Sequence, residues 1–112
     1  IDRFVDSTIA YQHFGLGVEI EFINMMNKYL LKNFKVDFTF LNTVNKKNMI
    51  KRLKRRKSLN RYDKFDLKFY TKVQNGFLKL SNKNKRKYKI INSNLDIKEN
   101  KNIIIEIIKK LI

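Results

Sequence analysis

The sequence predicts an α/β domain in which helices flank a parallel sheet. Segments with helical spacing of apolar residues alternate with two short runs rich in aromatic and β-branched residues, in the order helix, strand, helix, helix, strand, helix. Strands separated by helices are typical of parallel sheets. The chain of 112 residues suits a single domain, which we take to span residues 1–112. Two strands are few for a stable sheet, so we expect an incomplete fragment whose N-terminal part is missing.

The first half of the chain contains two helical segments and one strand. Residues 6–14 form a short helix or turn that Gly15 and Gly17 close. Residues 18–34 form a helix, because their apolar residues recur three or four apart and so share one face. These residues are Val18, Phe22, Met25, Met26, Tyr29 and Leu30. Residues 38–41 are aromatic, β-branched or aliphatic, which predicts a buried strand.

The second half continues with three helices and one strand. Asn45 is the expected N-cap of a helix over residues 46–55. The next helix covers residues 64–80 and buries Phe69, Tyr70, Val73, Phe77 and Leu80. Gly76 lies on that face, where we expect it to permit close packing. A charged loop over residues 81–87 leads to a strand over residues 88–92. A final helix over residues 97–111 turns inward the residues Ile104, Ile107, Ile108 and Leu111.

Composition leaves two explanations for the net charge of +16. One is nucleic-acid binding, since Lys and Arg neutralise phosphates. The other is codon bias, because 20 Lys, 14 Asn and 14 Ile stand against 6 Arg, as an AT-rich genome would give. There is no cysteine, which excludes disulfides and thiolate metal sites. No apolar run approaches the roughly 18 residues of a membrane span, so we expect a cytoplasmic protein.

Residues 2–12 concentrate polar groups suited to a phosphorylated ligand. Arg3 carries a planar fork of donors for a phosphate, or else it pairs with Asp2 or Asp6. Thr8 and Gln12 lie four apart, so on a helix they face one side and can bond the polar edge of a base. Alternatively, Thr8 caps the N-terminus of a helix and Gln12 is solvated. Tyr11 stacks on a ligand or packs in the core.

A basic segment follows at residues 52–61. It holds Arg52, Arg55, Arg56 and Arg61, four of the six arginines. Codon bias does not explain this clustering, because arginine is the scarce basic residue here. The segment is either a solvated helix end or a clamp on a transferring phosphoryl group. The chain lacks the glycine-rich phosphate loop G-x-x-x-x-G-K-[ST], and its one histidine, His13, excludes a histidine-pair metal site.

These motifs together resemble the thymidylate kinase family. Residues 2–12, Asp-Arg-Phe-Val-Asp-Ser-Thr-Ile-Ala-Tyr-Gln, are similar to its substrate motif D-R-[YF]-x-D-S-[ST]-x-A-Y-Q. Residues 36–41 resemble its strand P-D-L-T-F-L, and residues 69–80 resemble its helix F-x-x-R-V-R-x-G-Y-L-E-L. Residues 52–63 resemble its lid, although Asn60 and Asp63 depart from the usual D-R-x-E. Residues 88–96 resemble its I-D-A-S strand and loop, with Asn92 in place of Asp.

The resemblance implies a P-loop nucleoside monophosphate kinase-like fold, of which this chain is the C-terminal half or slightly more. The implied reaction is phosphoryl transfer from ATP, with Mg²⁺, to thymidine monophosphate (dTMP), for dTTP synthesis. The family further implies a homodimer. The rivals are a basic nucleic-acid-binding protein of ribosomal type and a related kinase for another monophosphate. Because most aromatic residues fall on apolar helix faces or in a strand, we do not expect nucleic acid as a partner. Because no apolar run is long enough for a membrane span, we do not expect a membrane either.

By position, the resemblance also implies roles for individual residues. Arg3 contacts the phosphate of dTMP, and Asp2 lies near Mg²⁺ and the phosphates. The nucleoside is held by Thr8 and Gln12 at the thymine ring, by Tyr11 at the deoxyribose, and by Phe4. The lid arginines over ATP are Arg52, Arg55, Arg56 and Arg61, and the residues near adenine are Asn92, Ser93 and Asn94.

Overall fold

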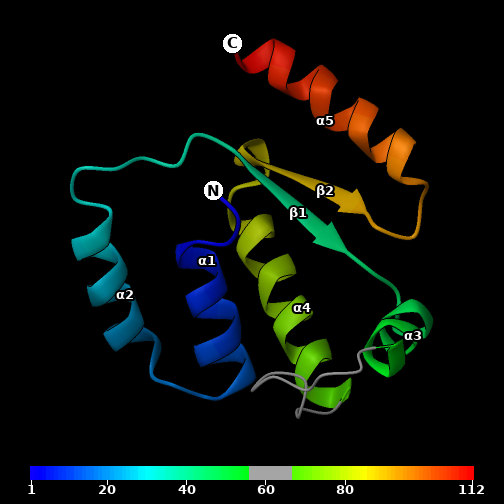
Figure 1. The fold of residues 1–112 in the computed structure, drawn as a ribbon. Helices are drawn as coiled ribbons and strands as arrows, with labels where there is room; N and C mark the ends of the chain where they lie inside the picture. Colours follow the sequence, from blue (N-terminus) through cyan, green and yellow to red (C-terminus); the bar gives the residue numbers. More distant parts are fainter. Residues whose placement is uncertain (56–66) are drawn as a thin grey trace.

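The computed structural model describes residues 1–55 and 67–112. Its elements follow the predicted α/β order (Figure 1). They are α1 (Val5–Thr8), the π-helix η1 (Ile9–Gly15), α2 (Ile20–Leu30), β1 (Thr39–Thr43), α3 (Lys46–Arg55), α4 (Leu67–Lys83), the 3₁₀ turn η2 (Lys85–Lys87), β2 (Tyr88–Asn92) and α5 (Ile97–Leu111).

The sheet is parallel, as predicted. In the described residues it has two strands, β1 and β2, in a register that runs from Thr39 opposite Tyr88 to Thr43 opposite Asn92. β1 begins one residue later than expected and ends two residues later. Figure 1 shows the sheet between α5 and α4. The carboxyl ends of both strands therefore meet at one edge, next to α3 and the start of α5.

The core lies between α4 and the α1–η1 segment. Its buried members are Ala10, Phe69 and Val73, against which Tyr11 and Phe77 pack. The predicted inward face of α4 is thus confirmed at Phe69 and Val73. The close packing at Gly76 is confirmed as well, because a Cβ there would lie 2.7 Å from ring atoms of Phe14. The bulk of a phenylalanine ring fits against α4 only where the helix has no side chain.

α2 leaves its apolar face uncovered. The helix is shorter than the predicted 18–34, and it buries Ile23 and Asn27. On the predicted apolar face, by contrast, Phe22 is 53% exposed, Met25 63% and Tyr29 81%. Periodicity identified which residues share a face, but no described segment packs against that face.

Two further expectations were wrong. Residues 81–83 belong to α4 rather than to a loop, and Ser81 is buried, with its Oγ donating to the Leu78 carbonyl at 2.8 Å. On α5, Ile108 and Leu111 are not inward, since they are 40% and 54% exposed. α5 buries no residue fully, because its sheet-facing side borders an open groove.

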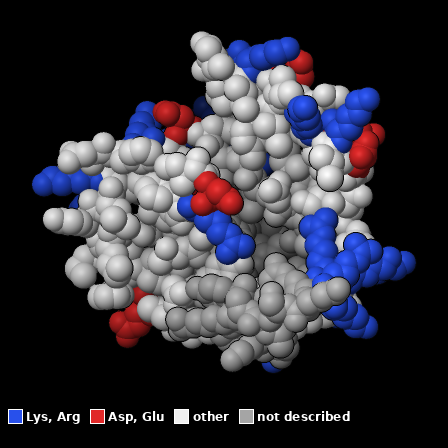
Figure 2. All heavy atoms as spheres, in the orientation of Figure 1, with Lys and Arg blue, Asp and Glu red and all other residues white. Residues whose placement is uncertain are grey.

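Positive charge gathers on α3. Six of its ten residues are Lys or Arg, and none is acidic. Figure 2 shows this charge at the right of the molecule, beside the residues drawn in grey. Among the described helices, none is both long enough and apolar enough to cross a membrane.

Candidate functional site

Arg3 holds an unusual backbone conformation at the start of the motif. Its φ is +60°, and it is the one non-glycine residue with positive φ among the residues that the structure describes. The left-handed region is costly for residues with a Cβ, and such strain clusters at binding sites. The Arg3 guanidinium carbon lies 5.3 Å from the centroid of the Tyr11 ring. The exposed cation is thus held over an aromatic face, and within the described residues it forms no ion pair with Asp2 or Asp6.

Asp6 anchors this segment to the sheet. The Tyr88 hydroxyl, at the start of β2, donates a hydrogen bond to Oδ2 of Asp6. Burial, together with this bond to a carboxylate, raises the pKa of Tyr88 above its usual value. The helix that carries Thr8, Tyr11 and Gln12 is therefore tied at its first turn to the amino ends of the strands.

A π-helix reshapes the middle of the motif. The Leu16 N–H donates to the carbonyl of Tyr11 at 3.1 Å, a spacing of five residues. Short π-helical segments are frequent at functional sites because they redirect side chains. Tyr11 packs against Phe69 and Phe77, at centroid distances of 6.0 and 6.3 Å. The ring of Tyr11 consequently packs against core residues and also contacts the guanidinium of Arg3.

The remaining residues of the motif differ in exposure. Thr8 is exposed, and Gln12 is partly buried. The Phe4 ring meets Phe34 edge-on, with centroids 5.5 Å apart. His13 has its Nδ1 2.8 Å from the carbonyl of Val18 and so closes the end of η1.

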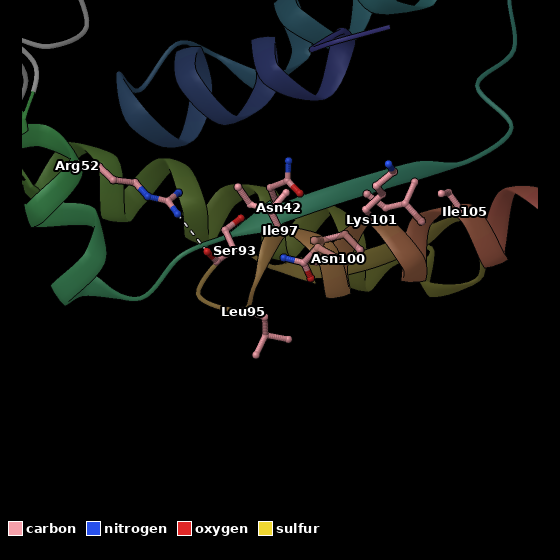
Figure 3. A pocket seen from close by; sticks show the side chains of 10 residues that line it. Asn42, Arg52, Ser93, Leu95, Ile97, Asn100, Lys101 and Ile105 are labelled. Atoms are coloured by element: carbon pink, nitrogen blue, oxygen red, sulfur yellow. Dashed lines mark hydrogen bonds between the residues drawn. The ribbon is translucent and has the colours of Figure 1, made fainter.

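The second set of predicted residues meets at the carboxyl ends of the strands, where open α/β sheets bind ligands. Arg52 on α3 donates from Nη2 to the carbonyl of Ser93 at 3.1 Å (Figure 3). Asn94, next in the chain, has Oδ1 2.7 Å from Nδ2 of Asn48. Helix α3, which carries Arg52 of the expected lid, and the expected adenine loop are thus in direct contact.

An open groove lies beside this contact. It has a volume of about 530 Å³, within the range of small-molecule sites. Its polar end is formed by Arg52, Ser93 and Asn42, and its longer apolar wall comes from β2 and α5 (Figure 3). We call it the α5 groove. Its long wall combines isoleucines with Asn100 and Lys101, and the guanidinium of Arg52 lies at one end (Figure 3). This combination of apolar surface and positive charge suits a base with an attached phosphate chain.

The structure does not bring the two sets of residues together. Arg3 precedes the helix that is tied to the amino end of β2, whereas Arg52 on α3 bonds Ser93 just after the carboxyl end of β2. Figure 1 shows the N-terminus near the start of the strands and α3 beyond their carboxyl ends. Five residues of strand separate the ends, or roughly 16 Å. Arg55 is exposed in the last turn of α3. Arg56 and Arg61 lie outside the described residues.

A protein-only metal cage is not present in residues 1–55 and 67–112. No three His, Cys, Asp or Glu residues lie close enough there to hold an ion. Mg²⁺ that is bound to a nucleotide does not need such a cluster. It uses one or two carboxylates of the protein and takes its other ligands from phosphates and water. Asp2, exposed beside Arg3, is the carboxylate available for that purpose in the motif.

Comparison with known proteins decides the family. The sequence model of thymidylate kinases matches residues 1–104. This chain belongs to the thymidylate kinase family. It is 33% identical over 109 residues to the thymidylate kinase of Sulfurihydrogenibium sp., covering 97% of this chain and 52% of that protein. It is 36% identical over 110 residues to that of the Wolbachia of Brugia malayi, covering 98% of this chain and 51% of that protein.

A solved structure agrees with this assignment. The thymidylate kinase of Ehrlichia chaffeensis superposes with a TM-score of 0.58 and 28% identity, over 97% of this chain and 47% of that one. The likeness supports the α/β fold with a small parallel sheet. The chain spans about half the length of the relatives that it matches.

Sequence reasoning missed three residues that shape the thymidylate kinase segment. Tyr88 holds Asp6, and Gln74 bonds both backbone groups of Val44. Asn48 bonds the expected adenine loop. Each contact joins residues at least 30 positions apart. No local pattern signals such a pair, so a single sequence contained no cue for them.

Proposed function

We propose that this chain supplies the monophosphate-binding motif and the lid helix of an enzyme that phosphorylates dTMP. A phosphate oxygen of dTMP attacks the γ-phosphorus of ATP, the bond from that phosphorus to the bridging oxygen breaks, and ADP leaves with dTDP formed. Membership of the thymidylate kinase family supports this reaction. The chain spans about half of its relatives and has no glycine-rich loop, so the complete reaction needs segments beyond residues 1–112.

The observation that carries the proposal is the conformation of Arg3. The left-handed backbone and the Tyr11 ring hold the exposed guanidinium of Arg3 in one place, and a phosphate is a ligand that suits this fork of donors. Arg3 binds the phosphate of dTMP in this proposal. Thr8 and Gln12 bond the thymine ring, Tyr11 lies against the deoxyribose, and Phe4 contributes to binding of the nucleoside.

We assign the ATP-binding site to the α5 groove. Adenine lies along the apolar wall near Asn92, Ser93 and Asn94, and Arg52 faces the phosphates. Asp2 would hold Mg²⁺, and the ion would supply positive charge to the transferring phosphates. Arg55, and beyond the described residues Arg56 and Arg61, add positive charge on the lid side. Catalysis would come mainly from positioning and charge stabilisation.

We further propose that the complete enzyme is a cytoplasmic homodimer. The exposed apolar face of α2 supports this assembly, because apolar patches of that kind mark interaction surfaces. Phe22, Met25 and Tyr29 are the residues that a second copy would cover. A monomeric enzyme at micromolar concentration in sedimentation experiments would contradict this part of the proposal.

The test requires a complete kinase domain. We define the fused enzyme as residues 1–112 joined behind the N-terminal half of the thymidylate kinase of Sulfurihydrogenibium sp. Calorimetry measures the affinity of this enzyme for dTMP and for thymidine, which lacks the phosphate. Arg3→Ala should weaken dTMP strongly and thymidine little, because only dTMP presents an anion to the guanidinium.

Gln12→Ala is the matched variant for the base. It should weaken dTMP and thymidine by a similar factor, about 5-fold to 100-fold, since the base edge loses an amide partner in both ligands. If Arg3→Ala weakens both ligands equally, Arg3 is a structural cation and the assignment of the phosphate site is wrong.

A further inference from the structure

The base of α3 is held on one side by α4. Gln74 accepts a hydrogen bond at Oε1 from the Val44 N–H, and its Nε2 donates to the Val44 carbonyl, both at 2.9 Å. Both bonds are partly buried. A side-chain amide that satisfies both backbone groups of one residue replaces a strand partner at that point. Val44 lies between β1 and α3, so Gln74 fixes the direction in which the chain enters the helix.

The opposite side of the base is held by Asn94. Its Oδ1 accepts from Nδ2 of Asn48 at 2.7 Å and from the N–H of Asn45 at 3.3 Å. Its Nδ2 donates to Oδ1 of Asn92 at 2.7 Å. A side-chain amide has two donor and two acceptor positions, and three of the four are used here within the protein. The side chain of Asn94 therefore has little capacity left to read a base.

These two contacts determine where Arg52 lies. Asn45 caps α3, with Oδ1 accepting from the Asn48 N–H at 2.8 Å, and Asn94 bonds both of these residues. Arg52 follows less than two turns later and reaches the Ser93 carbonyl beside the α5 groove (Figure 3). A tilt of the helix axis at its base would move this guanidinium away from the groove.

We propose that Gln74 and Asn94 are positioning residues that together fix α3, so that Arg52 stays at the polar end of the α5 groove. The proposal rests on the proposed function, in which this groove takes ATP. It changes one assignment, since Asn94 acts through α3 and Arg52 and does not contact adenine.

Steady-state kinetics of the fused enzyme separate positioning from base reading. Gln74→Ala and Asn94→Ala should each lower kcat by roughly 10-fold or more and raise the KM for ATP, because a displaced guanidinium misses the phosphates. The KM for dTMP should not change. Activity with ATP and with GTP should fall by the same factor. If Asn94→Ala changes the ratio of kcat/KM for ATP to that for GTP, Asn94 reads the base and the proposal is wrong.

Two exposed positions provide matched controls. The controls are Asn75→Ala and Asn102→Ala. Asn75 lies next to Gln74 on α4, and Asn102 lies on α5. Both should keep the kinetics of the parent enzyme. A double-mutant cycle between Asn48 and Asn94 should be non-additive, since either single change breaks the same bond. Additive effects would show that the two residues act separately, contrary to the proposal.

Hydrogen exchange separates failure of this proposal from failure of the proposed function. In the 112-residue chain, Gln74→Ala and Asn94→Ala should speed amide exchange across residues 46–55 by about 3-fold to 10-fold, as expected for loss of two hydrogen bonds that are partly buried at Gln74 and exposed at Asn94. Exchange in residues 5–15 should not change. A parent fused enzyme that is folded by circular dichroism but inactive would contradict the proposed function alone. Unchanged exchange in α3 would overturn the positioning role, whatever the activity.

Discussion

Replacing Gly76 with alanine tests the packing that holds the substrate motif in place. The new Cβ would lie 2.7 Å from Cγ and Cδ2 of Phe14, whereas ordinary contact begins near 3.4 Å. Phe14 lies in η1, and Gly76 lies in the middle of α4. Overpacking of this kind costs about 1–3 kcal/mol. The better helix propensity of alanine offsets about 0.8–1.0 kcal/mol of this cost. We therefore expect Gly76→Ala to lower the free energy of unfolding by about 1 kcal/mol.

Urea denaturation followed by far-UV circular dichroism measures this change in the 112-residue chain. Asn75→Ala is the control, because the neighbouring position is exposed and gains helix propensity without a clash. The two substitutions should therefore have opposite signs. If Gly76→Ala stabilises the chain as much as a glycine-to-alanine change does in a solvated helix, α4 and η1 do not approach this closely. In the fused enzyme the same substitution should raise the KM for dTMP, because η1 carries Tyr11 and Gln12.

Three further predictions follow from the sites. Tyr88→Phe should lower the free energy of unfolding by about 1 kcal/mol at pH 7, through loss of the bond to Asp6. Because the folded-state pKa of Tyr88 is raised, this stabilisation is complete below the unfolded pKa of about 10 and is lost as the pH rises further. The free energies of unfolding of the wild type and the variant should therefore converge at alkaline pH. A difference that stays constant with pH would exclude the bond. Arg52→Ala in the fused enzyme should lower kcat by roughly 100-fold with a smaller change in dTMP affinity, and an unchanged kcat would make Arg52 part of a solvated helix end. Oligonucleotide binding to the 112-residue chain should be weak, whereas tight binding with a steep salt dependence would favour the nucleic-acid rival.

The sequence predicted best the elements whose ends are set by local chemistry. The bounds of α3, β2 and α5 agree with the prediction, and Asn45 caps α3 through its own side chain. The α4 face was predictable because Phe69, Val73 and Gly76 recur at helical spacing and one neighbouring segment covers them.

Features that depend on distant partners were not predictable. Periodicity identified the apolar face of α2 without showing that it is exposed, because burial depends on what packs against a face. The bonds of Gln74 are tertiary contacts, and neither they nor the left-handed backbone of Arg3 has a signature in the local sequence. The motif itself pointed to Arg3, Thr8 and Gln12, and their roles as ligand contacts stay predictions.

The most direct measurement of the central claim is phosphoryl transfer by the fused enzyme. We predict that it converts dTMP and ATP to dTDP and ADP, that Arg3→Ala abolishes most of this turnover, and that the 112-residue chain alone shows none, because it lacks a glycine-rich phosphate loop. Chromatographic separation of the nucleotides measures all three reactions. A folded fused enzyme without turnover, or one whose turnover is unaffected by Arg3→Ala, would contradict the account, as would turnover by the 112-residue chain on its own.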